Sequence, residues 1–306
     1  MNHNSFPEPP TKPESLLGQF FRFLRRPLYT VNIPKDHPGI GDILRLYSLV
    51  ILTVLALGLI SSMVADYIQS GHILEDDKTL SPANLVVFGV FIAPLVEEMI
   101  FRLPLRYTPL NLTLPLHFLL VILVLILVGT KILPAIAAMP LIVTIISAGL
   151  LLRHWLKLKV NPKKIHTFYE KFIGWLVYLS TLSFGLIHIT NFTTSFQGST
   201  WLLAPLLVLP QIALGFFLAF VRLRHGFWWS VFTHGFHNAC ALTPLLLLQL
   251  VSPSLRANLE AGKGFKDAVG QDALFVSLIV VFLLGGIMLC AKTGWELIKE
   301  WRAEAR

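Results

Sequence analysis

The chain consists largely of long apolar runs that are separated by short polar stretches. A helix needs about 20 apolar residues to cross the hydrocarbon core of a bilayer, which is roughly 30 Å thick. On this criterion the pattern predicts an all-α polytopic membrane protein with about eight transmembrane helices. They lie near residues 45–68, 83–104, 111–130, 132–152, 172–191, 201–221, 227–250 and 273–291. Only the sequence TKILP separates the third run from the fourth, which leaves seven spans as the alternative.

The composition agrees with this interpretation. Of the 306 residues, 55% are hydrophobic and only 14% are charged, whereas a soluble domain carries about 25% charged residues. The two cysteines, Cys240 and Cys290, both fall in apolar runs and predict no disulfide framework. The first residues lack the order of a cleavable signal peptide, so we expect the first span to act as the insertion signal. The sequence favours a multi-pass protein of a cell membrane, with a bacterial inner membrane as the expected location.

The positions of the basic residues predict the orientation of the chain. Cytoplasmic loops carry an excess of Lys and Arg. With the N-terminus inside, the outer loops hold only five of the 25 basic residues, namely Lys78, Lys131, Arg256, Lys263 and Lys266. An even number of spans then places both the N- and C-termini in the cytoplasm. The net charge of +8 comes from residues that flank apolar runs, so we expect no nucleic-acid partner.

The chain divides into two regions. Residues 1–40 are expected to form a cytoplasmic basic N-terminal segment, and residues 41–306 form the transmembrane domain. Within the first region, the sequence LLGQFFRFLRRPL predicts either a helix that lies flat at the inner membrane surface or a plain basic flank. No internal repeat and no second soluble domain are evident in the sequence.

The second predicted span contains three ionisable residues in the sequence PLVEEMIFR, residues 94–102. A charge at membrane depth costs about 2.5 to 3.5 kcal/mol, so such groups normally face a protein interior. Glu98 and Arg102 are four residues apart and can pair on one helical face, whereas Glu97 points about 100° away from Glu98. A carboxylate buried without such a partner favours uptake of a proton, as a general base requires. The structural alternative is an ion network that ties helices together.

Two later spans also carry polar residues at helical spacing. The sequence FGLIH places His188 four residues after Phe184, and the sequence THGFHN places His234 and Asn238 on one face of a helix. An imidazole and an amide that project together into a low-dielectric interior can stabilise a developing oxyanion. The alternative in each case is a side chain that only bonds a neighbouring helix. In addition, Pro94 removes a backbone donor from its helix, which predicts a bend beside a cavity.

Together these motifs, Glu-Glu-x-x-x-Arg, Phe-x-x-x-His and His-x-x-x-Asn, resemble the CAAX protease and bacteriocin-processing (CPBP, or Abi) family of intramembrane glutamate endopeptidases, which includes the type II CAAX prenyl endopeptidases. The resemblance covers a catalytic core of about residues 83–245. It implies that Glu97 activates the hydrolytic water with help from His188, while His234 and Asn238 hold the oxyanion. It further implies that Glu98 and Arg102 support the site, without a covalent acyl-enzyme.

The spacing of the motifs raises two points. The chain has 85 residues between Arg102 and His188, more than members of that family often need, and the excess fits two extra spans. Because a pair of spans returns the chain to the same side, the orientation of the later motifs is preserved. On straight helices, however, Glu97 and His234 lie roughly 10 Å from the inner surface and His188 about 24 Å from it. Tilt or bending of helices is needed to bring them together.

Other functions are compatible with the same residues. His188, His234 and His237 with Glu97 or Glu98 offer zinc ligands, but the resemblance implies a metal-free site, so no cofactor is expected. Buried Glu and His side chains also occur in proton-coupled transporters, although no second half of the chain repeats the polar pattern. A non-catalytic immunity or scaffold protein is the third alternative. The expected partners are the lipid bilayer and a membrane-associated protein or peptide substrate, whether prenylated or not.

Overall fold

The computed structural model describes residues 14–27, 39–70, 81–192, 198–251 and 271–304, and every regular element in these ranges is helical. Six helices among the described residues are long and apolar enough to cross a membrane. They are Gly39–Tyr67, Pro82–Leu105, Pro109–Gly129, Ala135–Lys159, Pro162–Asn191 and Val276–Glu304. The prediction of an all-α multi-pass membrane protein is therefore confirmed.

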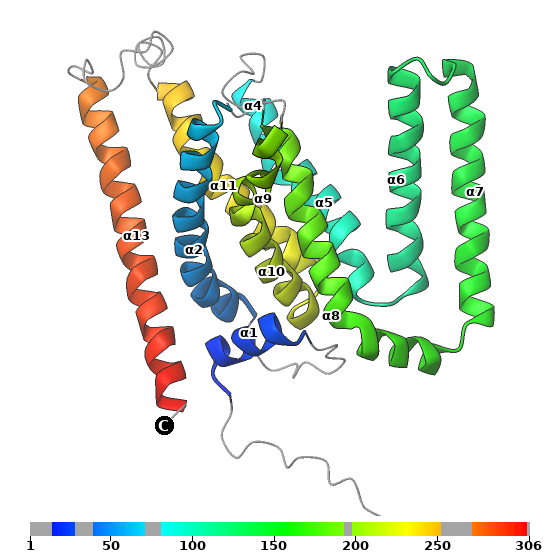
Figure 1. Cartoon of the computed structure of the whole chain (residues 1–306), viewed down its shortest axis with the longest axis horizontal. Coiled ribbons are helices and arrows are strands. Elements are labelled where there is room, and N and C mark those ends of the chain that lie inside the picture. Colours follow the sequence, from blue (N-terminus) through cyan, green and yellow to red (C-terminus); the bar gives the residue numbers. More distant parts are fainter. Residues whose placement is uncertain (1–13, 28–38, 71–80, 193–197, 252–270, 305–306) are drawn as a thin grey trace, which may run out of the picture.

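The two other predicted spans coincide with shorter or more central helices. The region predicted at 201–221 holds α9 (Ala204–Leu207) and α10 (Leu209–Arg224), and the region at 227–250 is α11 (Phe227–Val251). With 16 residues, α10 is about 24 Å long. It is buried on nearly all sides among α2 (Gly39–Tyr67), α8 (Pro162–Ile187) and α11 (Figure 1). The count of eight spans and the cytoplasmic position of both termini stay predictions.

The second span changes helix type along its length. It begins with α4 (Pro82–Asn84), continues as the π-helix η1 (Leu85–Ile92) and the α-helix α5 (Ala93–Phe101), and ends with η2 (Leu103–Leu105). π-helical turns are rare and are frequent at functional sites. The three predicted ionisable residues lie directly after this π-helix.

Local capping explains where several helices begin. Ser81, Thr108 and Asn161 each accept a hydrogen bond from a backbone N–H of the first turn, and each is followed by proline. Such a polar cap with proline at the first helical position favours a helix start. As a result α8 begins at Pro162 and not near residue 172 as predicted. Most of the basic stretch between the fourth and fifth predicted spans is therefore helical.

The two extra spans predicted between Arg102 and His188 are α6 (Pro109–Gly129) and α7 (Ala135–Lys159). They form an antiparallel hairpin around a turn in which Lys131 has a positive φ of 62°. Figure 1 shows this hairpin standing to one side of the other helices. Its first helix, α6, packs on α5 and η2 as well as on α7. The site described below is formed by the remaining bundle.

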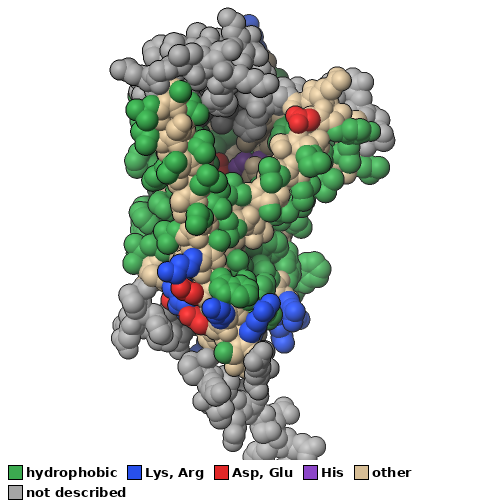
Figure 2. Space-filling model, turned by 90° about the vertical axis from the view of Figure 1, so that its left-hand side faces the viewer, with side chains coloured by type: hydrophobic (Ala, Val, Ile, Leu, Met, Phe, Trp, Pro, Cys, Tyr) green, Lys and Arg blue, Asp and Glu red, His purple; other side chains and the backbone are tan. Residues whose placement is uncertain are grey.

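The N-terminal helix α1 (Leu16–Arg25) lies across the lower end of the bundle (Figure 1). Leu16, Leu17, Phe20 and Phe23 are buried on one face, and the helix packs on α2, α10 and α13 (Gln271–Glu304). The predicted amphipathic helix therefore exists, but its apolar face contacts protein. Figure 2 shows Lys and Arg side chains gathered over the same end, below an apolar flank. Residues 1–13 and 28–38 of the predicted N-terminal segment lie outside the described residues.

Candidate functional site

Glu98 and Arg102 form a buried ion pair, as their spacing predicts. Glu98 Oε1 lies 3.6 Å from Arg102 Nη1, and neither side chain is exposed. The guanidinium also lies 3.9 Å from the ring centre of Phe184 on α8, and its Nη2 donates to the carbonyl of Gly215 on α10 at 3.5 Å. A side chain on Gly215 would press against this guanidinium. Arg102 therefore joins α5, α8 and α10 at the centre of the bundle.

The Glu98 carboxylate is fully engaged by groups on α11. Its Oε1 accepts a hydrogen bond from Nδ1 of His234 at 3.0 Å, and its Oε2 accepts a hydrogen bond from the hydroxyl of Ser230. Ser230 and His234 are one helical turn apart, so they present both groups on the same face. Sequence reasoning missed Ser230, although its position four residues before His234 was the available signal. Glu98 is thus a buried anion with three partners and no atom left to bind water.

Glu97 has a different environment. Its Oε2 lies 3.9 Å from Nε2 of His188 and 3.7 Å from Nε2 of His234, and this oxygen is buried without a hydrogen-bond partner among the described residues. These distances exceed a direct hydrogen bond, and each of the two gaps is short enough for one water molecule to bridge it. The structure therefore brings together three of the predicted residues from α5, α11 and the end of α8, where His188 begins the 3₁₀-helix η3 (His188–Asn191).

The hydrogen-bond partners of the two imidazoles assign their tautomers. Nδ1 of His188 lies 2.7 Å from the carbonyl oxygen of Phe184, and Nδ1 of His234 lies 3.0 Å from Glu98 Oε1. Both partners are acceptors, so each Nδ1 carries the proton and each neutral ring presents a bare Nε2. Three acceptor atoms therefore converge at Glu97 Oε2. Such a point attracts a hydrogen-bond donor such as a water molecule.

The two imidazoles also share an aromatic neighbour. Phe184 maintains the spacing, because its ring packs edge-on against both imidazoles, with centroid distances of 4.7 Å to His188 and 5.6 Å to His234.

The members of the cluster differ in exposure. The side chains of Glu97 and His188 are 24% and 18% exposed, whereas those of His234 and Glu98 are 2% and 0% exposed. The partly exposed Glu97 is thus the carboxylate that an incoming molecule meets.

Asn238 has a partner in the backbone of the second span. Its Nδ2 donates to the carbonyl of Gly89 at 2.8 Å. In η1 the N–H of Ala93 bonds the carbonyl of Phe88, five residues earlier, so the next donor in that pattern is Pro94, which has no N–H. The carbonyl lost to proline is therefore that of Gly89, and the Asn238 amide replaces the missing donor. Asn238 thus bonds a neighbouring helix, which is the alternative to an oxyanion role given above for this residue. An oxyanion would have to bind the second N–H of its amide.

Other buried polar groups lie around the site without a signal in the sequence pattern. The hydroxyl of Tyr47 on α2 lies 3.0 Å from Nδ1 of His237 on α11. Oxygen atoms of Thr181, Gln211 and Thr233 are buried without a hydrogen-bond partner among the described residues. Single polar residues in apolar runs give no periodic pattern, which is why these groups were not predicted.

The described residues contain no group of three or more His, Cys, Asp or Glu side chains arranged to hold a metal ion. The zinc interpretation, with His188, His234, His237 and Glu97 or Glu98 as ligands, stays an untested hypothesis. Comparison of the chain with models of protein families, with curated proteins and with solved structures gave no match. Function is therefore inferred from the geometry of the cluster.

Proposed function

We propose that this protein is an intramembrane endopeptidase of the CPBP type that hydrolyses a peptide bond of a membrane-associated protein or peptide. The supporting observation is the convergence of Glu97 Oε2 with Nε2 of His188 and Nε2 of His234. A water molecule that donates to Glu97 Oε2 and to Nε2 of His188 would be oriented and polarised at a point largely shielded from bulk solvent.

The proposed reaction needs only groups of this chain and one water. Glu97 Oε2 takes a proton from the water while the water oxygen attacks the carbonyl carbon of the scissile peptide bond. The oxyanion that forms is stabilised by Nε2–H of His234 in its protonated form. The proton taken up by Glu97, passed directly or through His188, then moves to the leaving nitrogen as the C–N bond breaks. The products are a free amine and a carboxylate, and no acyl-enzyme forms.

Glu98, Arg102 and Ser230 act as positioning residues in this proposal. Glu98 accepts the Nδ1 proton of His234, which fixes the tautomer and the orientation of the ring. The carboxylate is itself held by Arg102 and Ser230. None of the three is placed to touch the reacting atoms.

The decisive experiment compares membrane proteomes of cells that carry the wild-type protein or the Glu97→Gln variant, with mass spectrometry of new peptide termini. Glu97 makes no direct hydrogen bond, so we expect the isosteric variant to remain folded. The matched control is Glu170→Gln on α8, which removes an exposed carboxylate that pairs with His166. Termini seen with wild type and the control but lost with Glu97→Gln would support the protease and identify its substrate.

An unchanged set of termini with folded Glu97→Gln protein would contradict the proposal. A proton-coupled transporter would instead lose pH-dependent uptake in this variant, and a scaffold or immunity protein would keep its partner. We also propose that the protein lies in a bacterial inner membrane, crosses it eight times and has both termini in the cytoplasm. It does not require a prenylated substrate.

A further inference from the structure

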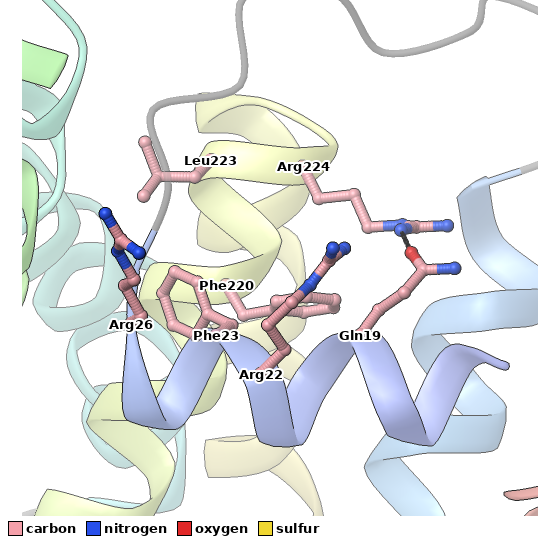
Figure 3. Close-up of a pocket in the computed structure, with 7 residues that line it drawn as sticks. All are labelled: Gln19, Arg22, Phe23, Arg26, Phe220, Leu223 and Arg224. Carbon is pink, nitrogen blue, oxygen red and sulfur yellow. Dashed lines mark hydrogen bonds between the residues drawn. The ribbon is translucent and has the colours of Figure 1, made fainter. Parts of the chain in front are cut away.

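Two glutamines of the bundle differ in whether their side-chain oxygens have hydrogen-bond partners. Gln19 on α1 donates through Nε2 to the carbonyl of Glu14 at 2.7 Å, and its Oε1 accepts a hydrogen bond from Arg224 beside a small cavity between α1 and the end of α10 (Figure 3). Gln211, in the first turn of α10, has its Oε1 buried without a hydrogen-bond partner in the described part of the chain. Such buried oxygens cost stability and are rare, and a bound water or ligand often supplies the missing donor.

The direction in which Gln211 faces follows from other residues on the same side of α10. Gly215 comes one turn later, and a Cβ atom there would lie 3.2 Å from the guanidinium of Arg102 and 3.2 Å from the ring of Phe184. Arg222, two turns after Gly215, donates from Nε to the carbonyl oxygen of Arg102 at 3.0 Å. Residues at this spacing share one face of a helix. This face of α10 therefore runs along the second span, and Gln211 lies at its N-terminal end.

The contacts between α8 and α10 give the relative direction of these two helices. A Cβ atom at Gly215 would lie 3.0 Å from the side chain of Thr181 on α8. One turn later on α8, Gly185 is in contact with Ile212, which comes before Gly215 on α10. The two helices are therefore antiparallel, and the first turn of α10 lies opposite the end of α8.

This register brings Gln211 to the level of His188. Phe184 faces Gly215, and His188 follows Phe184 by one turn of α8. Gln211 precedes Gly215 by one turn of α10, so it lies opposite His188. His188 in turn lies 3.9 Å from Glu97. Gln211 is therefore next to the Glu97 cluster, on a fourth helix that supplies none of the residues assigned to the reaction so far.

We propose that Gln211 is a substrate-binding residue whose Oε1 accepts a hydrogen bond from a backbone N–H of the substrate. The inference rests on the proposed endopeptidase function. An amide oxygen is a suitable acceptor for a peptide N–H, and substrate binding would satisfy the buried oxygen that lacks a partner in the free protein. A helical segment uses its own N–H groups in internal hydrogen bonds, whereas an extended segment offers them to a partner. The substrate class is therefore a peptide segment that is extended at the bound position.

Two variants separate binding from folding. Gln211→Met removes the amide and keeps a side chain of similar length. The matched control is Thr181→Val, which removes another oxygen that is buried without a partner among the described residues but lies two turns before His188. Neither change breaks a hydrogen bond seen there, so both proteins are expected to unfold at or slightly above the wild-type temperature. Thermal unfolding in detergent measures this.

The assay uses synthetic peptides that span the cleavage sites identified by comparing wild type with Glu97→Gln. We expect Gln211→Met to lower kcat/KM about fivefold or more, while Thr181→Val remains close to wild type. In a second series of peptides, one backbone N–H at a time is replaced by an ester oxygen at positions outside the scissile bond. One of these replacements is expected to lower kcat/KM for wild type and to have little further effect with Gln211→Met, because the same hydrogen bond is already lost.

The results distinguish this inference from the proposed function. Equal kcat/KM for wild type and Gln211→Met would overturn the role of Gln211 and leave the endopeptidase standing. Ester replacements with the same effect on both proteins would also overturn it, because they would indicate a merely structural role. If wild type yields no cleavage site at all, the proposed function fails, and this inference fails with it.

Discussion

Asn238 gives the carbonyl of Gly89 the hydrogen bond that Pro94 cannot supply. We predict that Asn238→Ala lowers the free energy of unfolding by about 1 to 3 kcal/mol, because a partly buried carbonyl loses its donor. Adding Pro94→Ala restores a backbone N–H and is expected to recover part of that loss. Thermal unfolding in detergent of the two single variants and the double variant measures the coupling. Strictly additive effects would show that the amide and the proline act independently.

The second prediction concerns the buried pair of Glu98 and Arg102. Arg102→Met leaves the Glu98 carboxylate buried without its cation, at an expected cost of about 3 to 5 kcal/mol. The double variant Glu98→Gln, Arg102→Met removes both charges and is expected to be more stable than Arg102→Met alone. The fraction of folded protein that survives a denaturing detergent titration provides the comparison. A double variant less stable than the single one would indicate that the Glu98 charge is needed by His234 and Ser230.

His188 is predicted to act in the reaction and not in folding. Among the described residues, the only hydrogen bond of its ring is to the carbonyl of Phe184, on the preceding turn. We expect His188→Gln to reduce the rate of substrate cleavage about 10²- to 10⁴-fold while unfolding remains close to wild type. His166→Gln, which changes an exposed histidine at the start of α8, is the matched control. If His188→Gln lowers the stability of the protein as well as its cleavage rate, His188 instead has a packing role.

A metal chelator tests the zinc alternative directly. The proposed reaction uses Glu97, His188, His234 and water alone, so cleavage is expected to continue after incubation with 1,10-phenanthroline and removal of the chelator. Abolition of cleavage that added zinc restores would replace the proposed mechanism by a metal-assisted one. Atomic absorption of the purified protein gives an independent count of bound zinc.

Close packing of α11 on η1 leads to a prediction about glycine. A Cβ atom at Gly235 would lie 2.7 Å from the carbonyl oxygen of Val90, whereas one at Gly285 on α13 would meet nothing within 4 Å. We expect Gly235→Ala to destabilise the protein by about 1 to 3 kcal/mol. Gly285→Ala is expected to leave stability unchanged or slightly raised, because alanine favours the helix. Unfolding midpoints that shift equally in both variants would contradict the inferred contact.

The sequence allowed the helical class and most of the site to be predicted. Apolar runs of about 20 residues located the six helices that are long and apolar enough to cross a membrane, and the spacing of Glu98 and Arg102 predicted their pairing, because both patterns depend only on helix geometry. The prediction that Glu97, His188 and His234 lie close together came from the order of three motifs. The sequence could not provide their distances, since those depend on how separate helices tilt and bend.

Three features escaped prediction for identifiable physical reasons. In an α-helix Pro94 would orphan the carbonyl of Val90, four residues earlier, but in the π-helix the orphaned carbonyl is that of Gly89, because the hydrogen-bond step is five residues. The cap at Asn161 starts α8 early, and Figure 1 shows its first turns running along the lower end before the helix rises. Ser230 escaped notice because a single serine in an apolar run is also common as a packing residue.

The contacts of α1 have a consequence for how the protein is made. Ser15, just before α1, hydrogen-bonds Glu304 at the end of α13, and 289 residues separate them. At synthesis rates of 5 to 20 residues per second, α1 leaves the ribosome about 15 to 60 s before α13 is complete. The contact between α1 and α13 can therefore form only when nearly the whole chain has been translated, whereas α1 can pack on α2 and α10 earlier.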